Sequence, residues 1–124
     1  MSIRGIGVDV VDVERMKKTL QEQGEPFVSK VFTETEIAYC RSRKSPHEHF
    51  AARFAAKEAV SKAMQKGWSG EFRWKDIEVM NEPSGAPKIV LYGELARLLR
   101  DTKVHLSLSH TEKTVVAFSI IEEE

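Results

Sequence analysis

The sequence predicts a single α+β domain over residues 1–124, in which a mostly antiparallel sheet packs against one long central helix. Three observations favour this fold class. A chain of 124 residues suffices for one domain with a modest core. An alanine-rich segment near the middle of the chain has the spacing of a helix. Most other apolar stretches are short, alternate with polar residues and are separated by turn-forming residues, as in antiparallel strands.

The chain is expected to open with a strand. The stretch IRGIGVDVVDV contains a short apolar run that we expect to be buried and to end near Asp9. Gly5 and Gly7 lie inside this run, and glycine within a strand indicates a β-bulge or the close approach of another backbone.

Helices are expected next. Asp12 can cap a helix formed by VERMKKTLQEQ, and Gly24 would end it. The segment FVSKVF is a further short apolar piece. Thr33 and Glu36 then have the spacing of a capping box, which predicts a second helix that ends at about RSR.

The carboxy-terminal half is expected to be rich in strands. DIEVM and KIVLY are two short strands joined by NEPSGAP, whose proline and glycine residues indicate a turn. GELARLLRD has the pattern of a short amphipathic helix. KVHLSLSH and TVVAFSII alternate polar and apolar residues and are expected to form a hairpin around TEK. The final EEE is expected to be a frayed, solvated end.

Composition argues against several classes of protein. Lys and Arg equal Asp and Glu at 19 each, and this balance does not suit a protein that coats nucleic acid non-specifically. The single cysteine, Cys40, cannot form a disulfide within the chain and makes an ordinary zinc site unexpected. No segment has the apolar run of a membrane span or of a signal peptide, so we expect a soluble, cytoplasmic protein.

The long helix is expected over residues 49–66, after a polar break centred on Pro46. One side of it carries small residues, which would let the helix axis lie close to a sheet. These residues are Ala52, Ala55, Ala56, Ala59 and Ala63. The opposite arc mixes charged and large apolar residues, namely Phe50, Arg53, Phe54, Lys57, Glu58, Lys62 and Met64. This arc is either an outer face with a Glu58–Lys62 ion pair or the wall of a half-covered cleft with cations for phosphates.

Asp9 bears on this choice, because a carboxylate at the end of a buried strand is costly when it is unpaired. A lysine or an arginine could pair with it. Alternatively, Asp9 and Glu58 could together form a pair of hard oxygen ligands, which suits Mg²⁺. Lysines beside such a metal would bind phosphate oxygens as point charges. The residues alone leave both alternatives open.

The stretch HLSLSHT places His105, Ser107 and Ser109 on one face of a strand and His110 on the other. Adjacent strand residues point apart, so Ser109 and His110 do not suit the nucleophile and base of a hydrolase, and the chain has no G-x-S-x-G motif. The remaining interpretations are hydrogen-bond donors towards an anion and purely structural residues.

Taken in order, the segments GIGVDVVDVERM, FTETE, RFAAKEAVSKAMQKG, GAPKI and HLSLSHT resemble the holo-acyl-carrier-protein synthase family. The resemblance runs from residue 3 to about residue 121. It implies the 4′-phosphopantetheinyl transferase fold and a role in fatty acid biosynthesis. The implied reaction transfers the 4′-phosphopantetheine arm of coenzyme A to a serine of acyl carrier protein and releases adenosine 3′,5′-bisphosphate. It also implies a homotrimer with active sites between neighbouring subunits.

The resemblance also assigns roles to positions. Asp9 and Glu58 match the Mg²⁺ ligands, and together with Lys62 they are expected to carry the catalysis. The positions expected to bind coenzyme A are Arg53, Lys57, Lys62, Gly85, Pro87, His105, Ser109, His110 and Thr111. Arg15 lies in the helix expected to bind the acidic carrier protein, although Glu14 and Glu22 dilute the positive charge of that helix.

Other classes of protein stay open at this point. The chain could be a nucleotide-binding regulator that uses the same cations without a metal, or a domain of a larger synthase. The start at Met1 and the short charged end favour an independent protein over such a domain. A hydrolase is disfavoured by the lack of a credible triad. The identity of the general base is left open.

Overall fold

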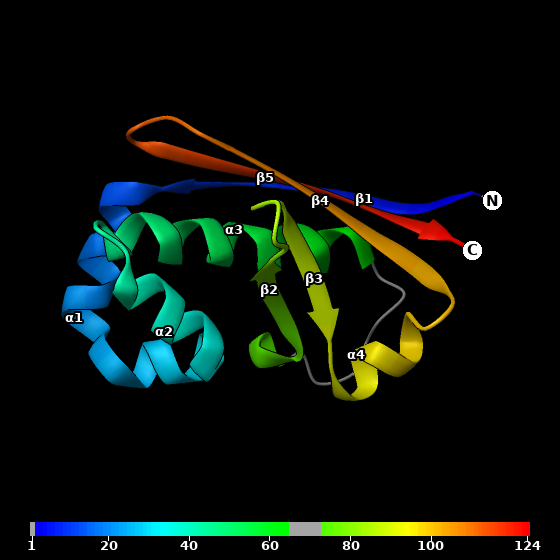
Figure 1. The fold of residues 1–124 in the computed structure, drawn as a ribbon, viewed down its shortest axis with the longest axis horizontal. Coiled ribbons are helices and arrows are strands. Elements are labelled where there is room, and N and C mark those ends of the chain that lie inside the picture. The colour runs from blue at the N-terminus through cyan, green and yellow to red at the C-terminus, as the bar shows by residue number, and fades with distance from the viewer. Residues whose placement is uncertain (1, 65–72) are drawn as a thin grey trace.

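A long helix lies between a three-stranded sheet and the remaining elements of the chain (Figure 1). The computed structural model describes residues 2–64 and 73–124. The elements in chain order are β1 (Ile3–Asp12), α1 (Val13–Val31), α2 (Glu34–Ser42), α3 (Pro46–Met64), the 3-10 helix η2 (Trp74–Asp76), β2 (Ile77–Asn81), β3 (Pro87–Leu91), α4 (Gly93–Leu98), β4 (Thr102–His110) and β5 (Thr114–Glu123). This arrangement confirms the predicted α+β class.

The three-stranded sheet has the strand order β1-β5-β4, and both of its pairings are antiparallel. Alternate residues of β5 are buried on the side that faces α3, and these are Val115, Ala117, Ser119 and Ile121. The other face of the sheet is apolar but uncovered in the single chain. On it, Val8, Val10 and Phe118 are 50%, 62% and 39% exposed.

The hairpins lie where the sequence predicts them. β2 and β3 pair antiparallel across the NEPSGAP turn, in which Gly85 has a positive φ of 94°. Such a φ suits glycine and strains other residues. β4 and β5 pair across the TEK segment, where the Thr111 hydroxyl accepts hydrogen bonds from the backbone N–H groups of Lys113 and Thr114.

The backbone of α3 lies against the backbone of β1. A Cβ atom added to Gly5 would lie 1.7 Å from the carbonyl oxygen of Ala63, and one added to Gly7 would lie 2.0 Å from that of Ala59. Only glycine leaves room for this contact. The predicted close approach is therefore confirmed at both glycines, and the β1–β5 register also shifts between Ile3 and Gly5.

The side of α3 that carries its charged and large apolar residues is mostly buried. This differs from both interpretations of that arc, an outer face and the wall of a half-covered cleft. α1, α2 and β2 contact α3. Phe50, Arg53 and Lys57 are buried, whereas Phe54 and Glu58 are half-buried. Most of the arc is therefore part of the core, and only a short portion of it borders a cavity.

Helix α1 starts and breaks where the sequence predicts. The Asp12 side chain accepts a hydrogen bond of 3.0 Å from the backbone N–H of Glu14 and so caps the helix. Gly24 has non-helical angles, φ 60° and ψ −147°, and divides α1 into two segments. The FVSKVF piece, to which the sequence assigns no structure, forms most of the second segment, which ends at Val31.

The capping box of α2 is also present. Thr33 Oγ1 accepts from the Glu36 N–H at 3.2 Å, and the Glu36 carboxylate accepts from the Thr33 N–H at 2.9 Å. Helix α3 begins at Pro46, earlier than expected, because a proline is well tolerated in the first turn of a helix. The predicted end of this helix at residue 66 lies outside the described residues.

The expectation of a frayed carboxy terminus is wrong. The strand β5 continues to Glu123, whose N–H donates to the carbonyl oxygen of Ser2 at 2.8 Å. Glu122 Oε1 lies 3.0 Å from His105 Nε2, and Glu123 pairs with Arg4 at 3.6 Å. Two of the three terminal glutamates therefore belong to the sheet.

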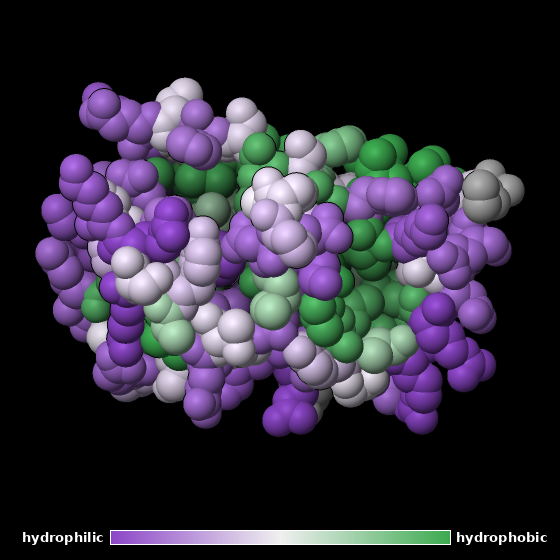
Figure 2. Space-filling view, viewed as in Figure 1, coloured by the Kyte–Doolittle hydropathy of each residue, from purple (hydrophilic) through white to green (hydrophobic). Residues whose placement is uncertain are grey.

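The surface is hydrophilic over much of α1 and α2, whereas apolar residues gather near β3 and α4 and beside the three-stranded sheet (Figure 2). Within residues 2–64 and 73–124, every helix is too short or too polar to cross a bilayer.

Gly7→Ala is expected to destabilise the fold by about 1–3 kcal/mol or more, because the new methyl group meets a backbone carbonyl that no rotamer change can move. Chemical denaturation would measure the loss. Arg4→Ala is the control in the same strand, since an exposed ion pair contributes only about 0–1 kcal/mol. Equal unfolding midpoints for the two variants would contradict the close contact.

Candidate active site

The two predicted metal ligands line one cavity. Asp9 comes from β1 and Glu58 from α3, and both border a cavity of about 500 Å³. They meet because α3 lies against β1 next to these residues. Arg15 of α1 lines the same cavity, and Phe27 and Phe54 contribute apolar walls. The cavity thus combines three carboxylates, since Asp12 also lines it, with a cation and an apolar surface.

Lys62 is a third charged residue in this region, in addition to Asp9 and Glu58. Its Nζ lies 3.0 Å from Asp9 Oδ1 and 3.3 Å from the carbonyl oxygen of Val8. The Asp9 side chain is 13% exposed and that of Lys62 is 54% exposed. Asp9 therefore has the lysine partner that the sequence left open. The outer-face interpretation required an ion pair between Lys62 and Glu58. Lys62 instead pairs with Asp9.

Asp9 is one of the groups that affect the titration of Glu58. Burial raises the pKa of Glu58, the Asp9 charge raises it further, and Lys62 opposes both effects. The hydrogen bond with Asp9 raises the pKa of Lys62, and the charge of Glu58 acts in the same direction. Two carboxylates with one ammonium leave the group short of positive charge, so an added cation would favour the ionised form of Glu58.

The donor set fits Mg²⁺. Two carboxylates from separate elements supply hard oxygen ligands, and Asp9 and Glu58 together carry more negative charge than the Lys62 ammonium offsets. Residues 2–64 and 73–124 contain no cluster of three or more His, Cys, Asp or Glu side chains suited to a metal. A magnesium ion with two protein ligands would complete its shell with water and substrate oxygens, which is its usual behaviour.

Arg53 lies apart from the carboxylates, on the side of α3 that faces the β2–β3 turn. Its Nη2 donates to Asn81 Oδ1 at 2.8 Å, and the Asn81 amide donates to the carbonyl oxygen of Gly85 at 3.1 Å. The guanidinium lies 4.2 Å from the ring centroid of Tyr39. Its buried Nε has no hydrogen-bond partner within the described chain. Arg53 and the predicted Gly85 are thus joined through Asn81.

His105 and Ser109 lie on the uncovered face of the three-stranded sheet. The register places His105 opposite Ile120 and Ser109 opposite Val116. Asp9 belongs to the face of the sheet that α3 covers, since it is opposite Ala117. Within one chain, these predicted nucleotide contacts are therefore on the other side of the sheet from the carboxylates.

The remaining predicted nucleotide residues lie near the turns. His110 and Thr111, at the tip of the β4–β5 hairpin, line a small cavity of about 130 Å³ with His49 of α3. Burial lowers the pKa of His49, and the charges of Arg43 and Arg53 lower it further. Pro87 begins β3, directly after the turn that contains Gly85.

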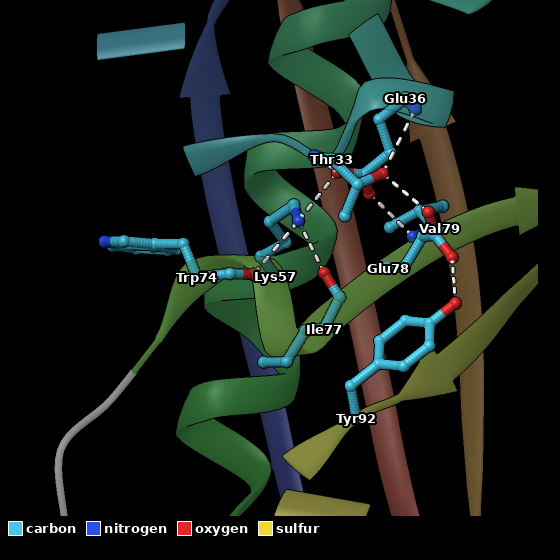
Figure 3. Close-up of polar contacts among 8 residues, drawn as sticks. All are labelled: Thr33, Glu36, Lys57, Trp74, Ile77, Glu78, Val79 and Tyr92. Carbon is cyan, nitrogen blue, oxygen red and sulfur yellow. Dashed lines mark hydrogen bonds and ion pairs between the residues drawn. The ribbon is translucent and has the colours of Figure 1, made fainter. Parts of the chain in front are cut away.

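The structure does not support Lys57 as a ligand of coenzyme A phosphates. Its side chain is 0% exposed, and its ammonium is paired with Glu36 at 2.8 Å (Figure 3). A phosphate outside the protein could reach this group only after the core opened. The sequence pattern misplaces Lys57 because a lysine among alanines carries no local signal of a buried partner.

Sequence reasoning also missed the residues that hold the site in place. Asn81 and Tyr39 fix Arg53, and Glu36 holds Lys57 in addition to its predicted role in the capping box. These partners are far from one another in the chain, so neither periodicity nor spacing points to them. One signal could have found them. If the long helix had been predicted to be buried on both sides, its cations would have required hydrogen-bond acceptors from other elements.

Comparison with known families decides the identity of the fold. A family model described as the 4′-phosphopantetheinyl transferase superfamily matches residues 5–119. The chain belongs to this superfamily. The resemblance inferred from its motifs is confirmed, and so is its class as a phosphopantetheinyl transferase.

Curated relatives of this transferase cover nearly its whole length. A holo-[acyl-carrier-protein] synthase of Koribacter versatilis is 44% identical over 124 residues, which is 98% of this chain and 99% of the relative. The holo-[acyl-carrier-protein] synthase of Protochlamydia amoebophila is 39% identical over 94% of this chain and 95% of the relative.

Solved structures agree with the fold. The crystal structure of holo-[acyl-carrier-protein] synthase from Neisseria meningitidis matches with a TM-score of 0.89 and 31% identity, over 98% of this chain and 99% of that one. A synthase from Bacillus anthracis, in complex with coenzyme A (3′,5′-ADP), matches with a TM-score of 0.83 and 34% identity over the full length of both chains.

The Glu58 carboxyl group is expected to titrate above an ordinary glutamate in the metal-free protein. Asp9→Asn should lower its pKa only part of the way back, because burial, the larger cause, remains. Carbon-13 NMR of the side-chain carboxyl groups would follow both titrations. Glu94→Gln, an exposed change on α4, should leave the Glu58 titration unaltered. An ordinary pKa for Glu58 in the unmodified chain would contradict this electrostatic arrangement.

Proposed function

We propose that this transferase moves the 4′-phosphopantetheine group of coenzyme A to a serine of apo-acyl carrier protein, as a holo-[acyl-carrier-protein] synthase. Its place in the superfamily and the names of its relatives support this function. A relative from Bacillus anthracis has been solved with coenzyme A, which supports coenzyme A as the donor. The observation that carries the proposal is that Asp9 and Glu58 line one cavity and that Lys62 pairs with Asp9.

In the proposed reaction, the serine oxygen of the carrier attacks the β-phosphorus of coenzyme A. A new P–O bond forms to the serine, the pyrophosphate P–O bond breaks, and adenosine 3′,5′-bisphosphate leaves with the electron pair. The protein has little covalent work in such a transfer and acts chiefly by positioning groups and offsetting negative charge.

Asp9 and Glu58 would hold Mg²⁺, which when bound supplies a Lewis acid for pyrophosphate oxygens. Lys62 is about one helical turn from Glu58 and would stabilise or protonate the leaving phosphate. The serine proton would pass to a water molecule ordered at the site, either directly or with Glu58 as the acceptor behind it.

The coenzyme A site would be completed by a neighbouring subunit. The residues proposed to contact the nucleotide are Arg53, Gly85, Pro87, His105, Ser109, His110 and Thr111. Two of them, His105 and Ser109, lie on the face of the sheet that the single chain leaves uncovered. A neighbour that packs on this face would bring its carboxylate cavity to these residues. Lys57 is not part of this proposal.

The first segment of α1 is proposed to bind the carrier protein. Arg15 lines the carboxylate cavity, and Lys17 and Lys18 border the adjoining surface depression together with Glu14 and Glu22. A basic side chain at the mouth of the cavity suits an acidic carrier whose serine must enter it. We place the reaction in the cytoplasm, within fatty acid biosynthesis.

Incubation with apo-acyl carrier protein, coenzyme A and Mg²⁺ is expected to increase the carrier mass by about 340 Da, the mass of the transferred group. Intact mass spectrometry measures it. Glu58→Gln should lose turnover far more than coenzyme A binding, and Glu94→Gln is the exposed control. Loss of binding with normal turnover at saturation would count against the role of Glu58. A nucleotide-binding regulator would leave the carrier mass unchanged, and calorimetry would show coenzyme A binding indifferent to Mg²⁺.

A homotrimer is expected because the family resemblance implies three subunits and the uncovered sheet face carries large apolar residues that a neighbour could bury. Phe118→Asp should dissociate the trimer and lower activity, since it places a charge at the centre of this face. Light scattering would report a mass of three chains of 14.1 kDa for the unmodified protein and one for the variant. Arg97→Asp, an exposed charge change on α4, is the control. A fully active monomer at micromolar concentration would refute the trimer.

A further inference from the structure

Lys57 directly precedes Glu58, but its side chain is held in the interior. The ammonium nitrogen lies 2.8 Å from Glu36 Oε1, 3.1 Å from the carbonyl oxygen of Trp74 and 2.5 Å from that of Ile77 (Figure 3). An ammonium group has three hydrogens to donate, and each of them has an acceptor here. Lys57 thereby ties α3 to α2 and to the start of β2.

Glu36 is fixed as firmly as the lysine it holds. Its Oε1 also accepts from the backbone N–H of Thr33 at 2.9 Å, and its Oε2 accepts from that of Val79 at 2.7 Å. A second carboxylate, Glu78, accepts from Thr33 Oγ1 at 2.5 Å and from the Tyr92 hydroxyl at 2.6 Å. The cluster therefore links α2, α3, η2 and β2 through hydrogen bonds to both backbone and side chains (Figure 3).

This anchor sets the rotation of α3 about its own axis. Neighbouring helical residues point about 100° apart, so fixing Lys57 towards α2 and β2 also fixes the direction of Glu58. The next residue, Ala59, lies against Gly7 of β1. The helix is thus held from two sides, and Glu58 projects between them into the cavity that Asp9 lines.

The same anchor supports a wall of the cavity. Lys57 binds the carbonyl group of Trp74, and the Trp74 ring stacks on Phe54 with a centroid distance of 5.2 Å and an interplanar angle of 25°. Phe54 lines the cavity together with Asp9 and Glu58. A shift of the η2 segment away from α3 would therefore change the wall as well as the carboxylate.

We propose that Lys57, held by Glu36, is a positioning residue of the transfer reaction that sets the direction of Glu58 and the position of Phe54 without touching the substrates. This inference rests on the proposed function. It gives a role to the buried lysine of the FAAKEA segment, since stability alone does not call for an interior ion pair that neutral residues can often replace as a whole at little cost.

Positioning can be separated from stability in this cluster. Removing one member of a buried ion pair leaves an uncompensated charge, whereas replacing both with neutral residues of similar size is often tolerated by the fold. The double variant Glu36→Gln/Lys57→Met removes both charges and the links to Trp74 and Ile77. It is expected to fold and to lose the anchor, together with one of the two backbone hydrogen bonds that Glu36 accepts, because a glutamine has a single acceptor oxygen.

The test compares this double variant with the unmodified enzyme at a temperature where both are folded, as judged by circular dichroism. We expect kcat for transfer to a carrier to fall by about 10- to 100-fold at saturating coenzyme A and Mg²⁺. Electron paramagnetic resonance with Mn²⁺ as the probe should report metal affinity weakened by about 10-fold or more in the absence of substrates. A merely structural role would lower the melting temperature and leave the metal affinity of the folded protein unchanged.

The matched control is Glu25→Gln/Arg41→Met, which neutralises an exposed ion pair of 2.5 Å between α1 and α2. It should keep both kcat and Mn²⁺ affinity. If the unmodified enzyme and the control both catalyse transfer, the double variant decides the positioning role. Unchanged kcat and Mn²⁺ affinity in that variant would overturn the positioning role and leave the proposed function standing. Lack of transfer by the unmodified enzyme would instead refute the proposed function.

A second variant covers the case in which the double variant does not fold. Lys57→Arg keeps the charge but puts a longer, planar group into the same space, which must displace Trp74 or Ile77 from α3. The folded arginine variant should show the same losses of kcat and Mn²⁺ affinity. Values equal to those of the unmodified enzyme would overturn the proposal.

Discussion

The contact between the backbone of α3 and the backbone of β1 is the constraint on which the rest of the structure depends. It exists because Gly5 and Gly7 offer no side chain where the helix presents Ala59 and Ala63. The helix comes within reach of the strand, and two carboxylates far apart in the chain share one cavity as a result. A larger residue at either glycine would move α3 away from β1 and separate the two carboxylates.

A helix so close to a sheet on one side must still be covered on the other. Here that second side carries Arg53 and Lys57, which are costly to bury unless each has acceptors. The fold supplies them from distant elements, with Asn81 for the arginine and Glu36 for the lysine. Charged side chains of a kind normally found on the surface therefore link α3 to the neighbouring elements of this protein. Asp9 and Glu58 lie at the edge of this buried region.

Much of this arrangement could be predicted from local sequence. The close approach at the glycines, the cap at Asp12 and the capping box at Thr33 depend on neighbouring residues, and each lies where expected. The α+β class follows from the change of periodicity along the chain. The assignment of Asp9 and Glu58 to one site came from two sources, the cost of a buried carboxylate and the resemblance to a family.

What could not be predicted depends on tertiary contacts. The sequence predicts Lys57 to be a phosphate ligand because its neighbours in the chain do not reveal its partner Glu36, which lies on another helix. The sequence predicts a free end for the terminal glutamates because their partners, Ser2, Arg4 and His105, lie in or directly beside other strands. In each case, a charged residue was expected to face water and was instead recruited by an element from elsewhere in the chain.

The break at Gly24 has an evolutionary consequence. It divides α1 so that the first segment contributes only Val13 and Met16 to the buried residues, while Val28 and Val31 secure the second. Substitutions on the exposed side of the first segment therefore cost the fold little. This surface is thus free to change its charge pattern through successive substitutions, whereas a change at Gly7 or Lys57 would disturb the buried contacts of α3.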